Sequence, residues 1–183
     1  MLFRSDLGNS IPAGATITSV SVKLEVVKSP SGGLGSVFEL HELTHDWGEG
    51  LKTQKTGSTA SVGEATWAAA KQGSLSWGAP GGKSGTDFDA KASSSVKIDG
   101  LKNYTFASTP DLVADVQGWL GNASKNNGWA LLSASENSAG TARRFASSED
   151  PRDALRPKLI IEFTPIPEPT SIALIAAGAG ALG

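Results

Sequence analysis

The chain has 183 residues, with 16 basic and 18 acidic side chains, 39% apolar residues and no cysteine. This length is enough to bury the core of one ordinary domain. The balanced charge, without a basic patch, argues against nucleic acid as a partner. The lack of cysteine excludes disulfides, thiolate metal sites and a cysteine nucleophile. The 22 glycines, with many serines and threonines, are typical of the turns and loops of all-β domains.

The first part of the chain is predicted to form β-strands. Leu2–Leu7 has the pattern of a short strand, and it has neither the basic nor the apolar region of a signal peptide. Thr16–Val27 alternates apolar and polar residues with a period of two, as a strand with one buried face does. Ser36–Leu43 shows a weaker form of the same alternation and indicates another strand.

The segment Thr44–Lys91 departs from this patterning. It is rich in Gly, Ala, Ser and Lys, yet it holds three of the five tryptophans, Trp47, Trp67 and Trp77. A loop this long inside a compact domain is usually functional or partly disordered. We expect it to be a variable recognition surface carried on a rigid scaffold.

The remaining elements are predicted to be one helix and several short strands. Thr109 is a good N-cap, Pro110 suits the first helical position, and Gly121-Asn122 ends the apolar stripe of the helix. Many short strands with glycine-rich connections favour an antiparallel β-sandwich or jelly roll, mainly β with one short helix. The predicted strands after Lys91 are 94–98 and 104–107 around an Asp99-Gly100 turn, then 128–134, 142–147 and 157–164.

The C-terminal part divides the chain into a domain of residues 1–164 and a tail of residues 165–183. Pro165–Pro169 is a stiff spacer that cannot continue a sheet. The 14 residues from Thr170 to Gly183 carry no charge. They are shorter than the roughly 20 apolar residues that span a bilayer. An apolar helix is predicted here, and a buried or frayed terminal helix is the simplest form of it.

The motif Pro167-Glu168-Pro169, followed by an apolar run, resembles the PEP-CTERM sorting signal of Gram-negative bacteria. The resemblance implies export to the cell envelope or the extracellular space. It also implies transient anchoring in the membrane by the tail, and cleavage by an exosortase-type membrane peptidase. The arginine-rich cluster that ends the family signal is absent from this sequence.

The body of the chain resembles DNRLRE-type domains through short motifs that occur in the family's order. That family implies a β-sandwich of the carbohydrate-binding-module type, found in secreted and surface proteins, some of which bind polysaccharides. One or two strands normally precede the position of Leu2 in the family, and Ser148 stands where an arginine is usual. The motifs are 2–7 with 11–17, 45–50, 63–67, 115–119, 127–132, 144–147 and 156–159.

Tryptophans of the long segment are the candidate sugar-binding residues. Trp67 and Trp77 sit among small residues, and with Trp47 they would offer flat indole platforms for sugar rings. The alternative is that these side chains fold back onto a core. Asp46 and Glu49 are candidate calcium ligands, because carboxylates bind calcium in many extracellular domains. The alternative for them is a turn in which Asp46 bonds the nearby backbone.

No motif points to catalysis, because there is no nucleophile elbow and no reason for two carboxylates to face each other. We therefore expect a non-catalytic exported protein of the envelope or extracellular matrix that binds polysaccharide. A purely structural matrix or adhesion module is the second interpretation. A polysaccharide-degrading enzyme, or the accessory domain of one, is the third.

Overall fold

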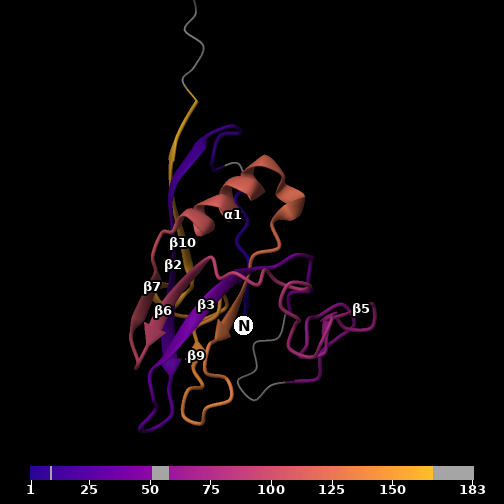
Figure 1. The fold of residues 1–183 in the computed structure, drawn as a ribbon, viewed down its shortest axis with the longest axis vertical. Coiled ribbons are helices and arrows are strands. Elements are labelled where there is room, and N and C mark those ends of the chain that lie inside the picture. Colours follow the sequence, from indigo (N-terminus) through magenta and orange to yellow (C-terminus); the bar gives the residue numbers. More distant parts are fainter. Residues whose placement is uncertain (9, 51–57, 167–183) are drawn as a thin grey trace, which may run out of the picture.

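The computed structural model describes residues 1–8, 10–50 and 58–166, and these are mainly β, as predicted. One sheet is antiparallel throughout, with strands in the order β1-β8-β3-β6 (Figure 1). Its strands are β1 (Leu2–Phe3), β8 (Trp129–Ser133), β3 (Ser36–Glu42) and β6 (Ser94–Ile98). β1 is shorter than predicted, because the chain leaves the sheet after Phe3, where Arg4 turns to pair with Asp46.

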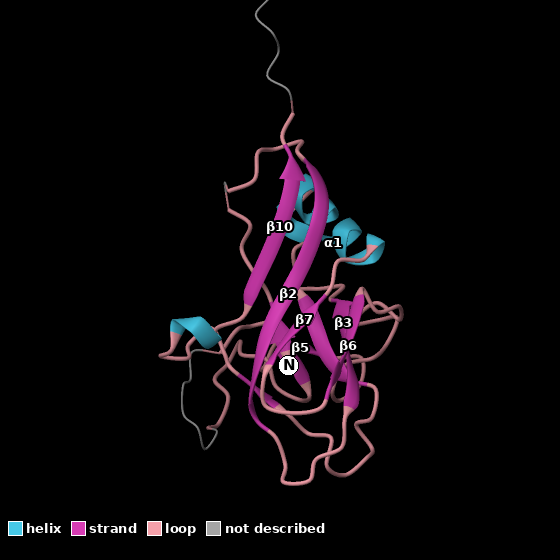
Figure 2. Cartoon of the chain, turned by 90° about the vertical axis from the view of Figure 1, so that its left-hand side faces the viewer, coloured by secondary structure: helices cyan, strands magenta, loops and turns pink. Residues whose placement is uncertain are grey.

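A second antiparallel sheet is built around the long strand β2, which pairs with β10 on one edge and β7 on the other. Val22 stands opposite Leu159 of β10 and Phe106 of β7. Figure 2 shows β10 and β2 running side by side. The far end of β2 pairs with the short strand β9. The strands are β2 (Thr16–Lys28), β7 (Asn103–Phe106), β9 (Arg144–Phe145) and β10 (Lys158–Thr164).

The two sheets enclose one hydrophobic core. The predicted alternation of β2 is confirmed, since Val20, Val22 and Leu24 are almost fully buried while the residues between them are partly exposed. These side chains belong to the same cluster as Phe38 and Leu40 of β3. Burial of apolar surface from both sheets is therefore what holds the two sheets together.

The single α-helix among the described residues, α1 (Pro110–Gly121), lies against the upper part of β2 in the view of Figure 1. Thr109 is its N-cap as predicted, and its Oγ1 accepts a hydrogen bond from the Leu112 amide at 3.0 Å. Gln117 fastens the helix to β2, because its Oε1 accepts from the Ile17 amide at 2.8 Å. The buried residues of the helix are Leu112, Val116 and Trp119.

The predicted strands around Asp99-Gly100 form, as β6 and β7, but they lie in different sheets. The turn between them therefore carries the chain from one sheet to the other. The Tyr104 hydroxyl accepts from the amides of Asp99 at 3.0 Å and Gly100 at 2.8 Å, which fixes this turn. Two short 3₁₀ helices, Ala123–Lys125 and Asp153–Leu155, complete the described elements.

The segment between β3 and β6, here called the insert (residues 43–50 and 58–93 as described), packs on the outer face of the first sheet. Its strands β4 (Ala69–Lys71) and β5 (Leu75–Ser76) form a small hairpin to one side of the molecule (Figure 1). Contrary to the prediction of an irregular loop, the insert has a core of its own. That core joins Leu43, Trp47, Ala70, Trp77 and Phe88 to Ala130 of β8.

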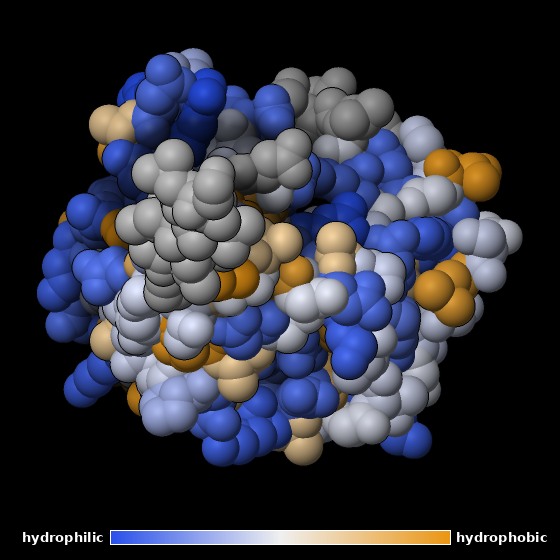
Figure 3. All heavy atoms as spheres, turned by 90° about the horizontal axis from the view of Figure 1, so that it is seen from above, coloured by the Kyte–Doolittle hydropathy of each residue, from blue (hydrophilic) through white to orange (hydrophobic). Residues whose placement is uncertain are grey.

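Residues 167–183, which include the predicted sorting motif Pro167-Glu168-Pro169, lie outside the described residues. Across the part of the chain that the structure describes, no helix has the length and apolar character needed to cross a membrane. Seen from above, the surface is mostly hydrophilic, with small scattered apolar patches (Figure 3).

Candidate functional site

The three tryptophans singled out in the sequence, Trp47, Trp67 and Trp77, line one cavity of about 460 Å³. The cavity lies between the insert and the outer face of the first sheet, which contributes Ala130 and Leu132. Its volume falls within the range of small-molecule sites. The structure thus brings together side chains that are far apart along the insert.

Trp67 is the exposed member of this group, with 70% of its surface accessible. It stands in a tight turn before β4, in which Thr66 Oγ1 accepts from the Ala69 amide at 3.0 Å. Its own carbonyl accepts from the Gly81 amide at 2.6 Å. Both ends of the turn are therefore fixed, and the indole is held outward at the mouth of the cavity.

Gly81 lies directly against the Trp67 ring, and this contact position is called the seat of Trp67 below. Its φ is +87°, and a Cβ at this position would collide with the six-membered ring of Trp67. Glycine is required here for two reasons, since other residues disfavour this backbone conformation and none leaves room for the indole. The backbone at Gly81 thus lies directly against the six-membered ring of Trp67, while most of this side chain stays exposed.

Trp47 and Trp77 are buried, with 7% and 9% of their surface accessible. Their indole N–H groups donate to backbone carbonyls, Trp47 to Asn127 at 2.8 Å and Trp77 to Thr66 at 2.9 Å. Their burial matches the alternative in which loop tryptophans fold back onto a core. They form walls of the cavity, and of the three it is Trp67 that presents an open ring face.

Two sequence motifs of the insert meet at Gly48. Its carbonyl accepts from the Ala65 amide at 2.7 Å, and its amide donates to the Ala70 carbonyl at 2.9 Å. A side chain at this position would overlap the Gly63 carbonyl. The segment 45–50 and the segment 63–67 therefore pack backbone against backbone, and this contact sets Trp47 relative to Trp67.

The candidate calcium ligand Asp46 is held by two cations. Its Oδ1 lies 2.6 Å from Arg4 Nη1 and its Oδ2 lies 2.6 Å from Lys71 Nζ. These hydrogen bonds, that of Lys71 above all, lower the pKa of the Asp46 carboxyl. Glu49 is exposed. Among the described residues, no three histidine, aspartate or glutamate side chains converge on a common point. Calcium at Asp46 and Glu49 stays a prediction from sequence.

Asp87 is a functional candidate whose role the sequence did not reveal. Its carboxylate is 1% exposed and accepts from the amides of Gly78 at 2.8 Å and Lys83 at 2.6 Å. His45 Nε2 lies 3.4 Å from its other oxygen. These bonds close the turn 78–83 that contains Gly81, so Asp87 positions the seat of Trp67. The sequence Pro80-Gly81-Gly82 is typical of a turn, but nothing in the sequence indicates that the Asp87 carboxylate accepts hydrogen bonds from the backbone of this turn.

We found no match to this chain among protein-family models, curated proteins or solved structures. A functional proposal therefore has to start from the residues of this cavity.

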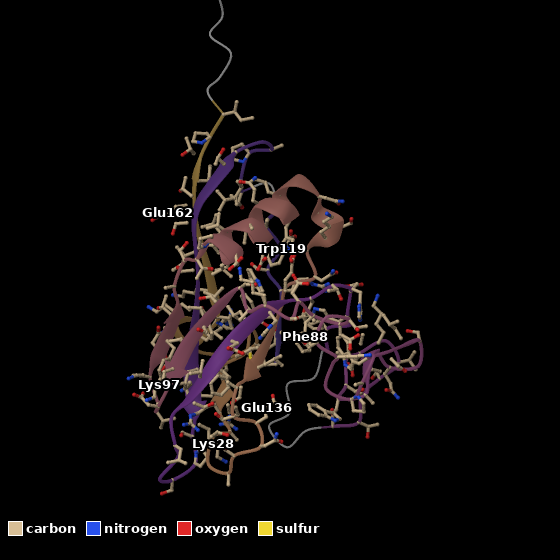
Figure 4. The ribbon with its side chains drawn as sticks, viewed as in Figure 1. Lys28, Phe88, Lys97, Trp119, Glu136 and Glu162 are labelled. Atoms are coloured by element: carbon tan, nitrogen blue, oxygen red, sulfur yellow. The ribbon has the colours of Figure 1, made fainter. Side chains whose placement is uncertain are left out.

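Carboxylates outnumber cationic groups in the lining of the cavity. Asp87 and Glu136 line it, and none of its described lining side chains is a lysine or arginine. Met1 also lines it, and its α-ammonium group interacts electrostatically with Glu136. Cation-carrying or uncharged ligands fit such a site better than anions, because like charges repel in a partly dehydrated pocket. Figure 4 labels Phe88, which belongs to the insert, and Glu136, which belongs to the loop after β8.

Carboxyl groups with raised pKa lie elsewhere, at the end of β3 and on α1. Burial raises the pKa of Glu42 and of Asp115. Glu42 accepts from Trp119 Nε1 and Asp115 accepts from Trp129 Nε1, each at 2.7 Å. Neither carboxyl lines the tryptophan cavity. These two acids complete the hydrogen bonding of core tryptophans, whose rings are 4.4 Å apart.

Proposed function

We propose that this chain is a non-catalytic polysaccharide-binding module of the DNRLRE type, with its two sheets arranged as an antiparallel β-sandwich. The family motifs occur in order along the chain, and two of them, 45–50 and 63–67, build the tryptophan cavity. The shared core of the two sheets supports the sandwich arrangement.

The observation that carries the proposal is the convergence of Trp47, Trp67 and Trp77 on one cavity, with the Trp67 ring open to solvent. The apolar face of a sugar ring stacks on an indole, while its hydroxyl groups bond polar groups at the rim. Glu136 supplies an acceptor for such hydroxyls. Because the platform is already fixed by Gly81 and Thr66, little conformational entropy is lost on binding.

The acidic lining favours neutral or amino sugars over uronic acids and sulfated sugars. Asp87 and Glu136 would repel a ligand carboxylate or sulfate. The preferred ligand class is therefore a neutral polysaccharide or one with cationic amino groups.

Display at the cell envelope or in the extracellular matrix is the setting that the tail supports. The motif Pro167-Glu168-Pro169 and the apolar run after it resemble a PEP-CTERM signal. On this proposal, an exosortase-type peptidase processes the chain after the tail has anchored it transiently in the membrane.

Affinity gel electrophoresis of the full chain tests the binding function. Native gels would contain neutral, amino and acidic polysaccharides in turn, with Trp67→Ala beside the wild type. Leu101→Ala is the control, since Leu101 is a similarly exposed apolar residue that lies outside the cavity. Retardation by one polysaccharide that is lost in Trp67→Ala and kept in Leu101→Ala supports binding. Equal mobility of all three folded proteins in every gel would refute it.

A purely structural matrix or adhesion module is the second candidate. The burial of Trp47 and Trp77, with both indole N–H groups satisfied by backbone, favours it, because the insert then serves as a rigid cover. A folded protein that no polysaccharide retards would fit this function. Release of reducing sugar from a polysaccharide would instead indicate an enzyme.

A further inference from the structure

A second hollow adjoins the tryptophan cavity and shares three of its lining residues. This hollow has a volume of about 490 Å³, and Met1, Trp67 and Glu136 line it as well as the first cavity. Its other walls come from β8, β9 and the loop 134–143. Trp67 therefore stands at the junction of two hollows, with an exposed ring that ligands in either can reach.

The loop 134–143 that borders the second hollow is held by its own hydrogen bonds. Thr141 Oγ1 donates to the Ser138 carbonyl at 2.7 Å and lies 2.9 Å from the Ser135 carbonyl. The Arg143 guanidinium donates to the carbonyls of Gly140 at 3.1 Å and Leu34 at 2.5 Å. The second hollow is thus preformed, because its wall does not need a ligand to take shape.

The polar groups of this hollow suit a sugar. Ser138 supplies a hydroxyl group, while Phe145 and Leu131 supply apolar surface. The Ser133 hydroxyl also lies there, but it already bonds Ser36 Oγ at 2.8 Å and accepts from the Ser135 amide at 3.2 Å. A few polar groups on apolar walls are the usual composition of a small-molecule site. Arg143 and Glu136 both line the hollow, so its charged groups are of both signs.

We infer that the two hollows are adjacent subsites of one groove that binds an extended glycan chain, with Trp67 and Glu136 at their junction. The inference rests on the proposed glycan-binding function and specifies its ligand as a stretch of chain rather than a single terminal sugar. One sugar unit stacks on Trp67, and units on either side enter the two hollows. Glu136 accepts hydroxyl hydrogen bonds from the units that flank the junction.

The dependence of affinity on the length of the oligosaccharide distinguishes this groove from a pocket for a single sugar. Isothermal titration calorimetry of the full chain would use ladders of one to six units prepared from cellulose, laminarin, starch and chitin. For the polymer that binds, affinity is expected to rise by about tenfold between the disaccharide and the hexasaccharide, since only the longer ligand fills both hollows. Equal affinity for every length would overturn the inference.

A variant that fills only the second hollow sharpens the test. Ala139 lines the second hollow and not the first. Ala139→Met should therefore lower the affinity for the hexasaccharide by about tenfold and leave the affinity for the disaccharide unchanged. Ala123→Met is the matched control, because Ala123 is exposed and lines neither hollow. Hexasaccharide binding that survives Ala139→Met overturns the inference while the glycan-binding function stands. If the folded protein gives no heat of binding with any ladder, both the proposed function and the groove are refuted.

Discussion

The six-membered ring of Trp67 rests on the backbone of Gly81 so closely that a Cβ at position 81 would enter the ring. An exposed tryptophan is usually mobile, but this one is fixed by a glycine that lies in the left-handed region at φ +87°. The side chain that we propose as the sugar platform is thus positioned by a residue that has no side chain. Several consequences of this and related contacts can be measured.

Replacing Gly81 by Ala should displace Trp67 and abolish glycan retardation. The positive φ alone costs about 1–2 kcal/mol of unfolding free energy, and the collision with the indole adds to it. Gly85→Ala is the control, because Gly85 has φ +72° with nothing near its Cβ position. Urea denaturation should show a loss in both variants, whereas affinity gels should show lost binding in Gly81→Ala alone. Retained binding in Gly81→Ala would mean that the seat of Trp67 is unimportant.

Replacing Gly48 by Ala should destabilise the insert, because the new methyl group would overlap the Gly63 carbonyl. Overpacking of this kind typically costs about 1–3 kcal/mol. Gly50→Ala serves as the control, since its Cβ would sit in ordinary contact, 3.8 Å from the Glu64 carboxyl group. Urea denaturation followed by tryptophan fluorescence compares the two. Equal unfolding midpoints would contradict the close approach of the two motifs.

Replacing Asp87 by Asn should loosen the turn 78–83. Asparagine has only one acceptor oxygen. Its NH2 group must therefore face an amide N–H, either at Oδ2, which accepts from both Gly78 and Lys83, or at Oδ1, which lies 3.1 Å from the Gly78 amide. A buried hydrogen-bond mismatch of this kind costs about 1–3 kcal/mol. Asp89→Asn, the same change at an exposed residue two positions on, should cost much less. Amide hydrogen exchange at Lys83 reports the effect, and unchanged protection in Asp87→Asn would rule out the positioning role.

The raised pKa of Glu42 predicts that the free energy of unfolding depends on pH. Burial raises its pKa above the unfolded value of 4.5, so over the range between the two values the folded state binds more protons than the unfolded state. The free energy of unfolding should therefore fall as the pH rises through that range. Glu42→Gln keeps an acceptor for Trp119 but cannot ionise, so its stability should fall less. Urea denaturation in steps from acid to neutral pH measures both proteins, and parallel profiles would contradict the assignment to Glu42.

The negative charge of Glu136, at the junction of the two hollows, predicts that binding depends on the charge of the polysaccharide. Replacing it by Gln keeps the acceptor and removes the negative charge, so binding of an acidic polysaccharide should strengthen while binding of a neutral one changes little. The strengthening should shrink in high salt, because exposed charges are screened. Affinity gels at two ionic strengths compare Glu136→Gln with the exposed control Glu149→Gln. Identical behaviour of the two variants would locate the ligand away from Glu136.

Local chemistry explains which parts of the fold were predictable. The alternation of β2 and the capping of α1 by Thr109 depend on neighbours in sequence, so both could be predicted. The strands β6 and β7 were predicted too, but their separation into two sheets depends on pairing partners from β3 and β2. The core of the insert could not be predicted from its own sequence, because it includes Ala130 of β8, a strand far along the chain.

The sequence alone was enough to single out the tryptophans of the insert, because they stand among small residues. The surroundings of each tryptophan depend on the tertiary structure. Trp67 and Trp77 have similar sequence neighbours, yet one rests on Gly81 in solvent and the other is buried with Phe88. Burial is set by what packs against a side chain, and the packing partners here are distant in sequence. Asp87 became a positioning residue for the same reason, because the amides that it binds converge only in the folded turn.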